Sequence, residues 1–90
     1  MELFKSPFGS VELTTERKNH ILQFHPEVRN FLKDFPKTLS QPDTVKRSKF
    51  DEKAYIFYRQ SKKNFLAIVV KTNHRCFILT AYVTNKLKGL

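Results

Sequence analysis

The chain contains few of the residues on which several classes of functional site depend. Its 90 residues include one cysteine, two glycines and no tryptophan. Cys76 cannot form an internal disulfide, and it lies in an apolar run where a thiol behaves as a small hydrophobe, which favours a reducing compartment. Gly9 and Gly89 form no glycine-rich phosphate loop, which excludes P-loop nucleotide hydrolysis. One cysteine and three scattered histidines match no zinc spacing, so we expect no metal and no other cofactor.

Long apolar runs are also absent. The longest, Phe65 to Val70, is far shorter than the roughly 20 residues that cross a bilayer, and the N-terminus lacks the pattern of a secretory signal. We therefore expect a soluble, cytoplasmic protein with no membrane association. Because so short a chain cannot form two cores, residues 1–90 are expected to be a single domain.

Acidic residues are few relative to basic ones. Lys and Arg number 17 against 8 Asp and Glu, which gives a net charge of +9. Such an excess favours polyanions, so nucleic acid or an acidic protein is the expected partner. The alternative is a basic domain whose charge has no binding role.

The first half of the chain predicts a turn region and two helices. Short alternating runs on either side of Pro7 and Gly9 indicate a loose hairpin or turn. Thr14 or Thr15 is a suitable N-cap for a helix that reaches about Phe24, before His25 and Pro26 interrupt it. A second helix, which Pro36 ends or kinks, is predicted by apolar residues at helical spacing: Val28, Phe31, Leu32 and Phe35.

The second half predicts strands. Four segments are rich in β-branched and aromatic residues: Thr44 to Lys49, Ala54 to Gln60, Phe65 to Thr72 and Arg75 to Val83. Their short polar connections require antiparallel neighbours, because a parallel crossover needs a dozen or more residues. The predicted fold is α+β, with two N-terminal helices packed on one face of a four-stranded antiparallel sheet.

The remaining chemistry is acid–base catalysis assisted by cations. RNA carries its own nucleophile, the 2′-hydroxyl, so a metal-free ribonuclease needs only a base, an acid and positive charge near the phosphate. Histidine is a common proton carrier in acid–base catalysis, and His20 is the candidate for that role. Thr80 and Tyr82 lie two apart in a strand, so they present two hydroxyls on one face. Charge near the phosphate could come from Lys71, Arg47 or Arg59.

Each of these residues also has a purely structural interpretation. His20 borders an apolar stripe and can be a packed residue, and His25 can help to cap the second helix. Lys71 can be a solvated strand end, and Thr80 and Tyr82 are good strand formers in any case. The cluster of Lys46, Arg47 and Lys49 is either a solvated face or a track for phosphates.

Seven short pieces, in this order and spacing, resemble the phage-barnase-EndoU-colicin-RelE-like nuclease domains, the BECR fold. The resemblance spans roughly residues 13–88. The pieces are Thr15-Glu16-Arg17, His20-Ile21, His25-Pro26-Glu27, Pro42-Asp43-Thr44-Val45, Ile56-Phe57-Tyr58-Arg59, Val69-Val70-Lys71 and Ile78-Leu79-Thr80-Ala81-Tyr82.

The resemblance implies two N-terminal helices on a four-stranded antiparallel sheet and a metal-independent endoribonuclease, often used as a toxin or in phage conflict. It implies an acidic antitoxin or immunity protein as a partner. His20 would be the proton carrier, Lys71 the phosphate cation, and Thr80 with Tyr82 the strand-borne groups of the site. Arg17 and Arg59 would be further cations, and His25 would orient the second helix.

Two other functions are compatible with the same residues. The first is a noncatalytic RNA-binding module, in which Tyr55 or Tyr58 stacks on bases. Its phosphate contacts would come from Lys46, Arg47, Lys49, Lys62 and Lys63. The second is a structural or protein-binding domain whose charge is incidental.

Overall fold

The computed structural model describes residues 1–85, and it shows that the N-terminal hairpin is regular structure. Strands β1 (Glu2–Ser6) and β2 (Gly9–Leu13) pair antiparallel. Gly9 has a φ of +98° in the connecting turn, a conformation that glycine adopts without strain. The Ser6 hydroxyl donates to the Gly9 carbonyl at 2.8 Å and closes the turn. Residues 86–90, which include the end of the BECR resemblance, lie outside the described part.

The helical region differs from the prediction after its first helix. Thr14 caps α1 (Thr15–Phe24) by accepting from the Arg17 amide at 3.1 Å. Pro26 disfavours helical geometry at His25, so α1 ends there. The expected second α-helix is instead a 3₁₀ segment, η1 (Pro26–Asp34), followed by the short helix α2 (Phe35–Ser40). The apolar spacing does not separate the two helix types over so few residues, and a proline is tolerated at the first helical turn, so Pro36 begins α2 instead of ending a helix.

The sheet has six strands, and the prediction of a four-stranded antiparallel sheet is wrong. The last four strands, β3 (Thr44–Arg47), β4 (Ala54–Ser61), β5 (Asn64–Asn73) and β6 (Arg75–Thr84), pair antiparallel in chain order. The hairpin joins them because β2 pairs parallel with the start of β6. The strand order is β1-β2-β6-β5-β4-β3, so the sheet is mixed.

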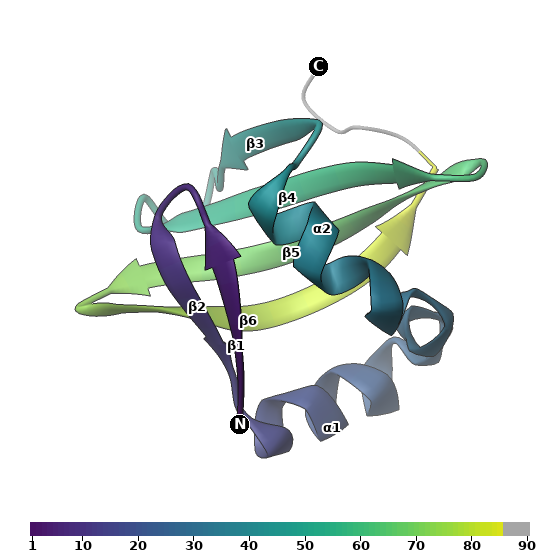
Figure 1. Cartoon of the computed structure of the whole chain (residues 1–90), viewed down its shortest axis with the longest axis horizontal. Coiled ribbons are helices and arrows are strands. Elements are labelled where there is room, and N and C mark those ends of the chain that lie inside the picture. Colours follow the sequence, from purple (N-terminus) through teal and green to yellow (C-terminus); the bar gives the residue numbers. More distant parts are fainter. Residues whose placement is uncertain (86–90) are drawn as a thin grey trace.

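The hairpin and the helical segments lie on the same side of strands β4, β5 and β6. Figure 1 shows the hairpin and α2 in front of β4, β5 and β6, with α1 along the lower edge. At the hairpin tip, the Phe8 ring makes edge contacts with Tyr55 and Phe57, at centroid distances of 4.9 and 5.4 Å. The core between these layers contains Val11, Leu13, Ile21, Val28, Phe35, Leu39, Phe57, Leu66, Ile68, Val70, Ile78 and Ala81.

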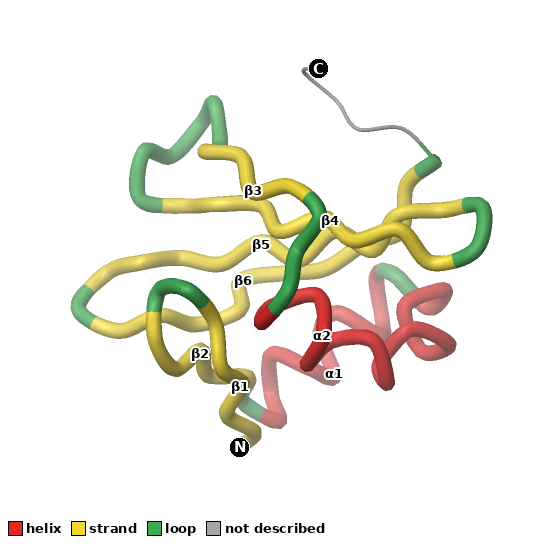
Figure 2. The backbone as a smooth tube through the Cα atoms, turned by 45° about the horizontal axis from the view of Figure 1, so that its top comes forward, coloured by secondary structure: helices red, strands yellow, loops and turns green. Residues whose placement is uncertain are grey.

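Along each strand, the side chains between the core residues point to the opposite side of the sheet. We call this side the open face. Figure 2 shows the helices grouped on one side of the strands, away from this face. The residues assigned to the open face by strand register and alternation are Thr44, Lys46, Ile56, Tyr58, Ala67, Val69, Lys71, Phe77, Thr80 and Tyr82. Within residues 1–85, no helix is long and apolar enough to cross a membrane.

Candidate functional site

Two tyrosines meet across the middle of the open face. Tyr58 and Tyr82 are the register partners of Ala67 on its two sides, so the three residues form a row over β4, β5 and β6. The small side chain of Ala67 leaves room above it, and Tyr58 forms a hydrogen bond to the Tyr82 hydroxyl. Burial and this hydrogen bond raise the pKa of Tyr58 to about 12. Tyr58 therefore keeps its proton to a more alkaline pH than an exposed tyrosine does.

A β-bulge in β6 determines which hydroxyls reach the open face. Val69 pairs with Thr80 but Val70 pairs with Ile78, so Leu79 has no partner in the register. The additional residue shifts the alternation, and Ala81 then faces the core with no exposed surface. Thr80 and Tyr82 consequently lie on the open face, with their side chains on the same side of one strand.

His25 is the histidine whose ring lies near that of Tyr82. Its ring centroid lies 6.2 Å from that of Tyr82, and its Nδ1 lies 3.6 Å from a Glu27 carboxylate oxygen. The side chain makes no capping hydrogen bond to η1. The sequence suggested only an orienting or capping role for His25, although the His-Pro pair shows where α1 must end and turn toward the sheet.

A cavity of about 590 Å³ is lined by Tyr58 and Tyr82, whereas neither His25 nor Thr80 is part of its lining. Ile56, Tyr58 and Tyr82 come from the central strands, and the other lining residues come from β3 and the segment that follows it. Those residues are Lys46, Arg47, Ser48, Lys49 and Phe50. The cavity therefore combines phenolic hydroxyls with the basic cluster that the sequence identified as a possible phosphate track.

The four predicted catalytic residues do not meet in this cavity. Tyr82 lines it, and Thr80 lies on the same face of β6. The His20 ring packs on Phe24 at a centroid distance of 4.7 Å and faces a different depression on α1, which it lines with Thr14, Glu16 and Arg17.

Lys71 is engaged by an ion pair. Its ammonium group contacts the Asp51 carboxylate, which also accepts from the Lys53 amide at 2.9 Å. Both interactions favour the charged carboxylate and hold the pKa of Asp51 below its usual value. The cation predicted to contact phosphate is thus already balanced by an anion.

Two of the predicted arginines contact groups of the protein itself. The Arg47 guanidinium donates to the Tyr55 hydroxyl at 3.3 Å and lies 5.7 Å from the centre of that ring. Arg59 donates to the Gln41 carbonyl and lies 3.8 Å from an Asp43 oxygen. Arg59 therefore fastens β4 to the segment that precedes β3, on the core side of the strand.

No protein-family model, curated protein or solved structure matches the chain.

The arrangement is suited to phosphate binding and proton transfer. Tyrosine and threonine hydroxyls donate hydrogen bonds to anionic oxygens, and an imidazole accepts or releases a proton near neutral pH. Lysine side chains at the cavity supply positive charge. Within residues 1–85, no three His, Cys, Asp or Glu side chains come together in a way that could hold a metal ion.

Proposed function

We propose that this domain is a metal-independent endoribonuclease that cleaves RNA on the open face of its sheet. The observations that carry the proposal are a cavity lined by lysines, Tyr58 and Tyr82, and the His25 ring, which lies outside the cavity lining with its centroid 6.2 Å from that of the Tyr82 ring. The charge of +9 and the resemblance to BECR nuclease domains support the same substrate.

The proposed reaction is a transesterification. The 2′-oxygen attacks the adjacent phosphorus and the bond to the 5′-oxygen breaks, which yields a 2′,3′-cyclic phosphate and a free 5′-hydroxyl. The proton of the 2′-hydroxyl passes to a base, and an acid supplies a proton to the departing 5′-oxygen. The phosphate gains negative charge on the way, so hydrogen-bond donors and cations at that position accelerate the reaction.

We assign these roles to a small set of residues. His25 is the proton carrier, because its ring is the imidazole beside Tyr82. The hydroxyls of Thr80 and Tyr82 donate to the non-bridging phosphate oxygens, and Lys46 supplies charge at the cavity wall. His20, the carrier implied by the BECR resemblance, is the competing assignment.

The test is cleavage of a labelled single-stranded RNA in EDTA by the wild type, His25→Ala and His20→Ala. We expect His25→Ala to lose about 10²- to 10⁴-fold in rate, the usual contribution of a general acid or base, with nearly unchanged RNA affinity. His20→Ala, a matched histidine on the same segment, is expected to stay active. Loss in His20→Ala alone would move the proton carrier to the α1 depression, and a wild type inactive in EDTA would refute the nuclease proposal.

A noncatalytic RNA-binding module is the second candidate. It is favoured by the ion pair between Lys71 and Asp51, which neutralises the cation expected to assist catalysis. Salt-sensitive RNA binding by the wild type, without cleavage and without an effect of either histidine substitution, would establish this function instead.

A further inference from the structure

Phe50 is the most exposed large hydrophobic side chain reported for the described residues. It is 98 % exposed, compared with 62 % for Phe24 and 41 % for Phe8. A phenyl ring in water forgoes the favourable free energy of burial, so such exposure is informative when the backbone that carries the ring is held in place.

Hydrogen bonds and an ion pair hold the segment that carries Phe50, residues 48–53 between β3 and β4. The Phe50 amide donates to the Ser48 hydroxyl at 3.2 Å, and the Ser48 amide donates to the Ala54 carbonyl at 2.8 Å. Asp51 connects the segment to β5 through its ion pair with Lys71. These contacts hold the backbone while they leave the Phe50 ring in solvent.

The surroundings of Phe50 select a polyanion. The ring lines the same cavity as Lys46 and Lys49, which both precede it in the chain. The floor of that cavity carries the hydroxyls of Tyr58 and Tyr82. An apolar ring beside cations, at a cavity that also carries tyrosines, matches a ligand that alternates flat bases with phosphates.

The aromatic residues that the sequence suggested for base stacking are otherwise occupied. Tyr55 lies between the Phe8 ring and the Arg47 guanidinium. Tyr58 is only 2 % exposed, so it cannot offer its face to a base. Phe50 is therefore the most exposed of the aromatic side chains that line this cavity.

We propose that residues 48–53 are a capture site for single-stranded RNA, in which Phe50 stacks on an unpaired base. Lys49, the neighbour of Phe50 in the chain and at the cavity, then contacts an adjacent phosphate. The inference rests on the proposal that RNA is the ligand, and it adds the substrate class: a paired base has no free face for this ring, so duplex RNA is excluded from the stacking contact. Stacking on a phenyl ring does not discriminate strongly among bases, so we expect little sequence preference.

The test uses the absence of tryptophan from the chain. Phe50→Trp introduces a single indole, whose fluorescence reports stacking directly. The ligand is a short 2′-O-methyl oligonucleotide, which has no 2′-hydroxyl nucleophile and is not cleaved, offered as a single strand or a duplex. We expect quenching by the single strand only. Phe50→Ala should weaken single-strand binding by roughly 5- to 150-fold, the range of one stacked base.

Leu3→Ala is the matched control, because Leu3 is 61 % exposed and lies on β1 at the opposite edge of the sheet. It should bind like the wild type. The capture site would be overturned if Phe50→Ala bound the single strand with wild-type affinity and the indole of Phe50→Trp were not quenched. Neither result would change the outcome of the cleavage assay. Quenching by poly-glutamate but not by the oligonucleotide would also overturn the capture site, in favour of protein docking. If Phe50→Ala loses RNA binding and the wild type does not cleave RNA, the capture site is supported and the nuclease proposal fails.

Discussion

The buried phenol of Tyr58 makes the floor of the cavity sensitive to alkaline pH. Its pKa of about 12 arises mainly from burial, with the hydrogen bond to Tyr82 as a further cause. In the unfolded chain a tyrosine loses its proton near pH 10. Between about pH 10 and 12 the unfolded state therefore binds fewer protons than the folded state, so the stability of the fold decreases as pH rises through this range.

Tyr58→Phe should remove this contribution. We expect the free energy of unfolding of the variant to fall less steeply between about pH 10 and 12 than that of the wild type, as measured by urea denaturation. In an absorbance titration of the folded protein, the tyrosine that ionises at about pH 12 should be absent from the variant. An identical alkaline profile for the two proteins would contradict the assignment of this pKa to Tyr58.

The sequence could predict part of the site at this scale. The shared face of Thr80 and Tyr82 follows from a spacing of two in a strand, and the structure places both on the open face. Which face they share depends on the bulge at Leu79, which no local pattern indicates. The position of His25 beside Tyr82 depends on how α1 packs along the sheet, so it could not be read from the sequence.

The N-terminal hairpin is held to the rest of the sheet by few strand contacts. Its parallel pairing with β6 involves only Val11 with Cys76 and Glu12 with Phe77. Aromatic packing supplements this short ladder. The Phe8 ring contacts the rings of Tyr55 and Phe57, and the ring centroids of Phe4 and Phe35 are 6.2 Å apart. The tip of the hairpin is therefore fastened across the core face by the Phe8 ring.

Phe8→Ala should release that fastening. Edge contacts between aromatic rings contribute about 0.5 to 1.5 kcal/mol beyond the area that they bury, so we expect a loss of about 1 to 3 kcal/mol in the free energy of unfolding. Urea denaturation measures this loss. Leu3→Ala removes an exposed apolar side chain from the same hairpin and should stay within about 0.5 kcal/mol of the wild type. Equal effects of the two substitutions would show that the Phe8 contacts do not hold the hairpin.

The short parallel pairing of β2 with β6 also explains which elements could be predicted from the sequence. Strands β3 to β6 are long or closely connected, and their alternation and short turns identify both the strands and their order. The hairpin was predicted, but its membership of the sheet was not, because four residues far apart in the chain decide it. The 3₁₀ geometry of η1 was missed because its apolar residues recur at spacings that an α-helix also satisfies.

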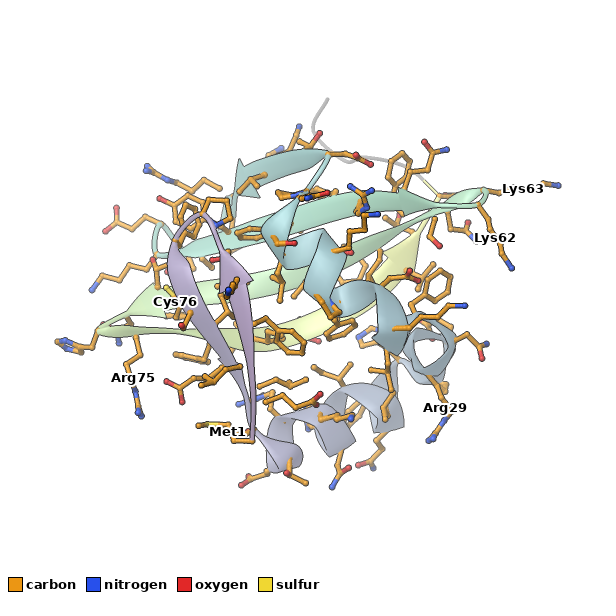
Figure 3. All side chains as sticks on the ribbon, viewed as in Figure 1. Met1, Arg29, Lys62, Lys63, Arg75 and Cys76 are labelled. Atoms are coloured by element: carbon orange, nitrogen blue, oxygen red, sulfur yellow. The ribbon has the colours of Figure 1, made fainter. Side chains whose placement is uncertain are left out.

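The positive charge of the whole molecule is spread well beyond the candidate site. Figure 3 shows Lys62 and Lys63 at the tip of the β4–β5 turn, and Arg75 at the opposite end of the sheet. Lys49 follows β3 and lines the cavity near the start of β4, whereas Lys62 lies just past its other end. Diffuse attraction of RNA would involve all of these cations, but a capture site should involve only those at the cavity.

Paired lysine substitutions separate these two forms of binding. Each phosphate neutralised on a single strand adds about 0.7 to the slope of log affinity against log salt concentration, so Lys49→Ala should weaken binding and flatten the slope by about that amount. Lys62→Ala removes the same charge from the far turn and should leave the slope nearly unchanged. Fluorescence anisotropy with the 2′-O-methyl single strand, over a series of salt concentrations, measures both. If the two variants lose the same slope, RNA is held by the field of the whole molecule, and the cavity has no special part in binding it.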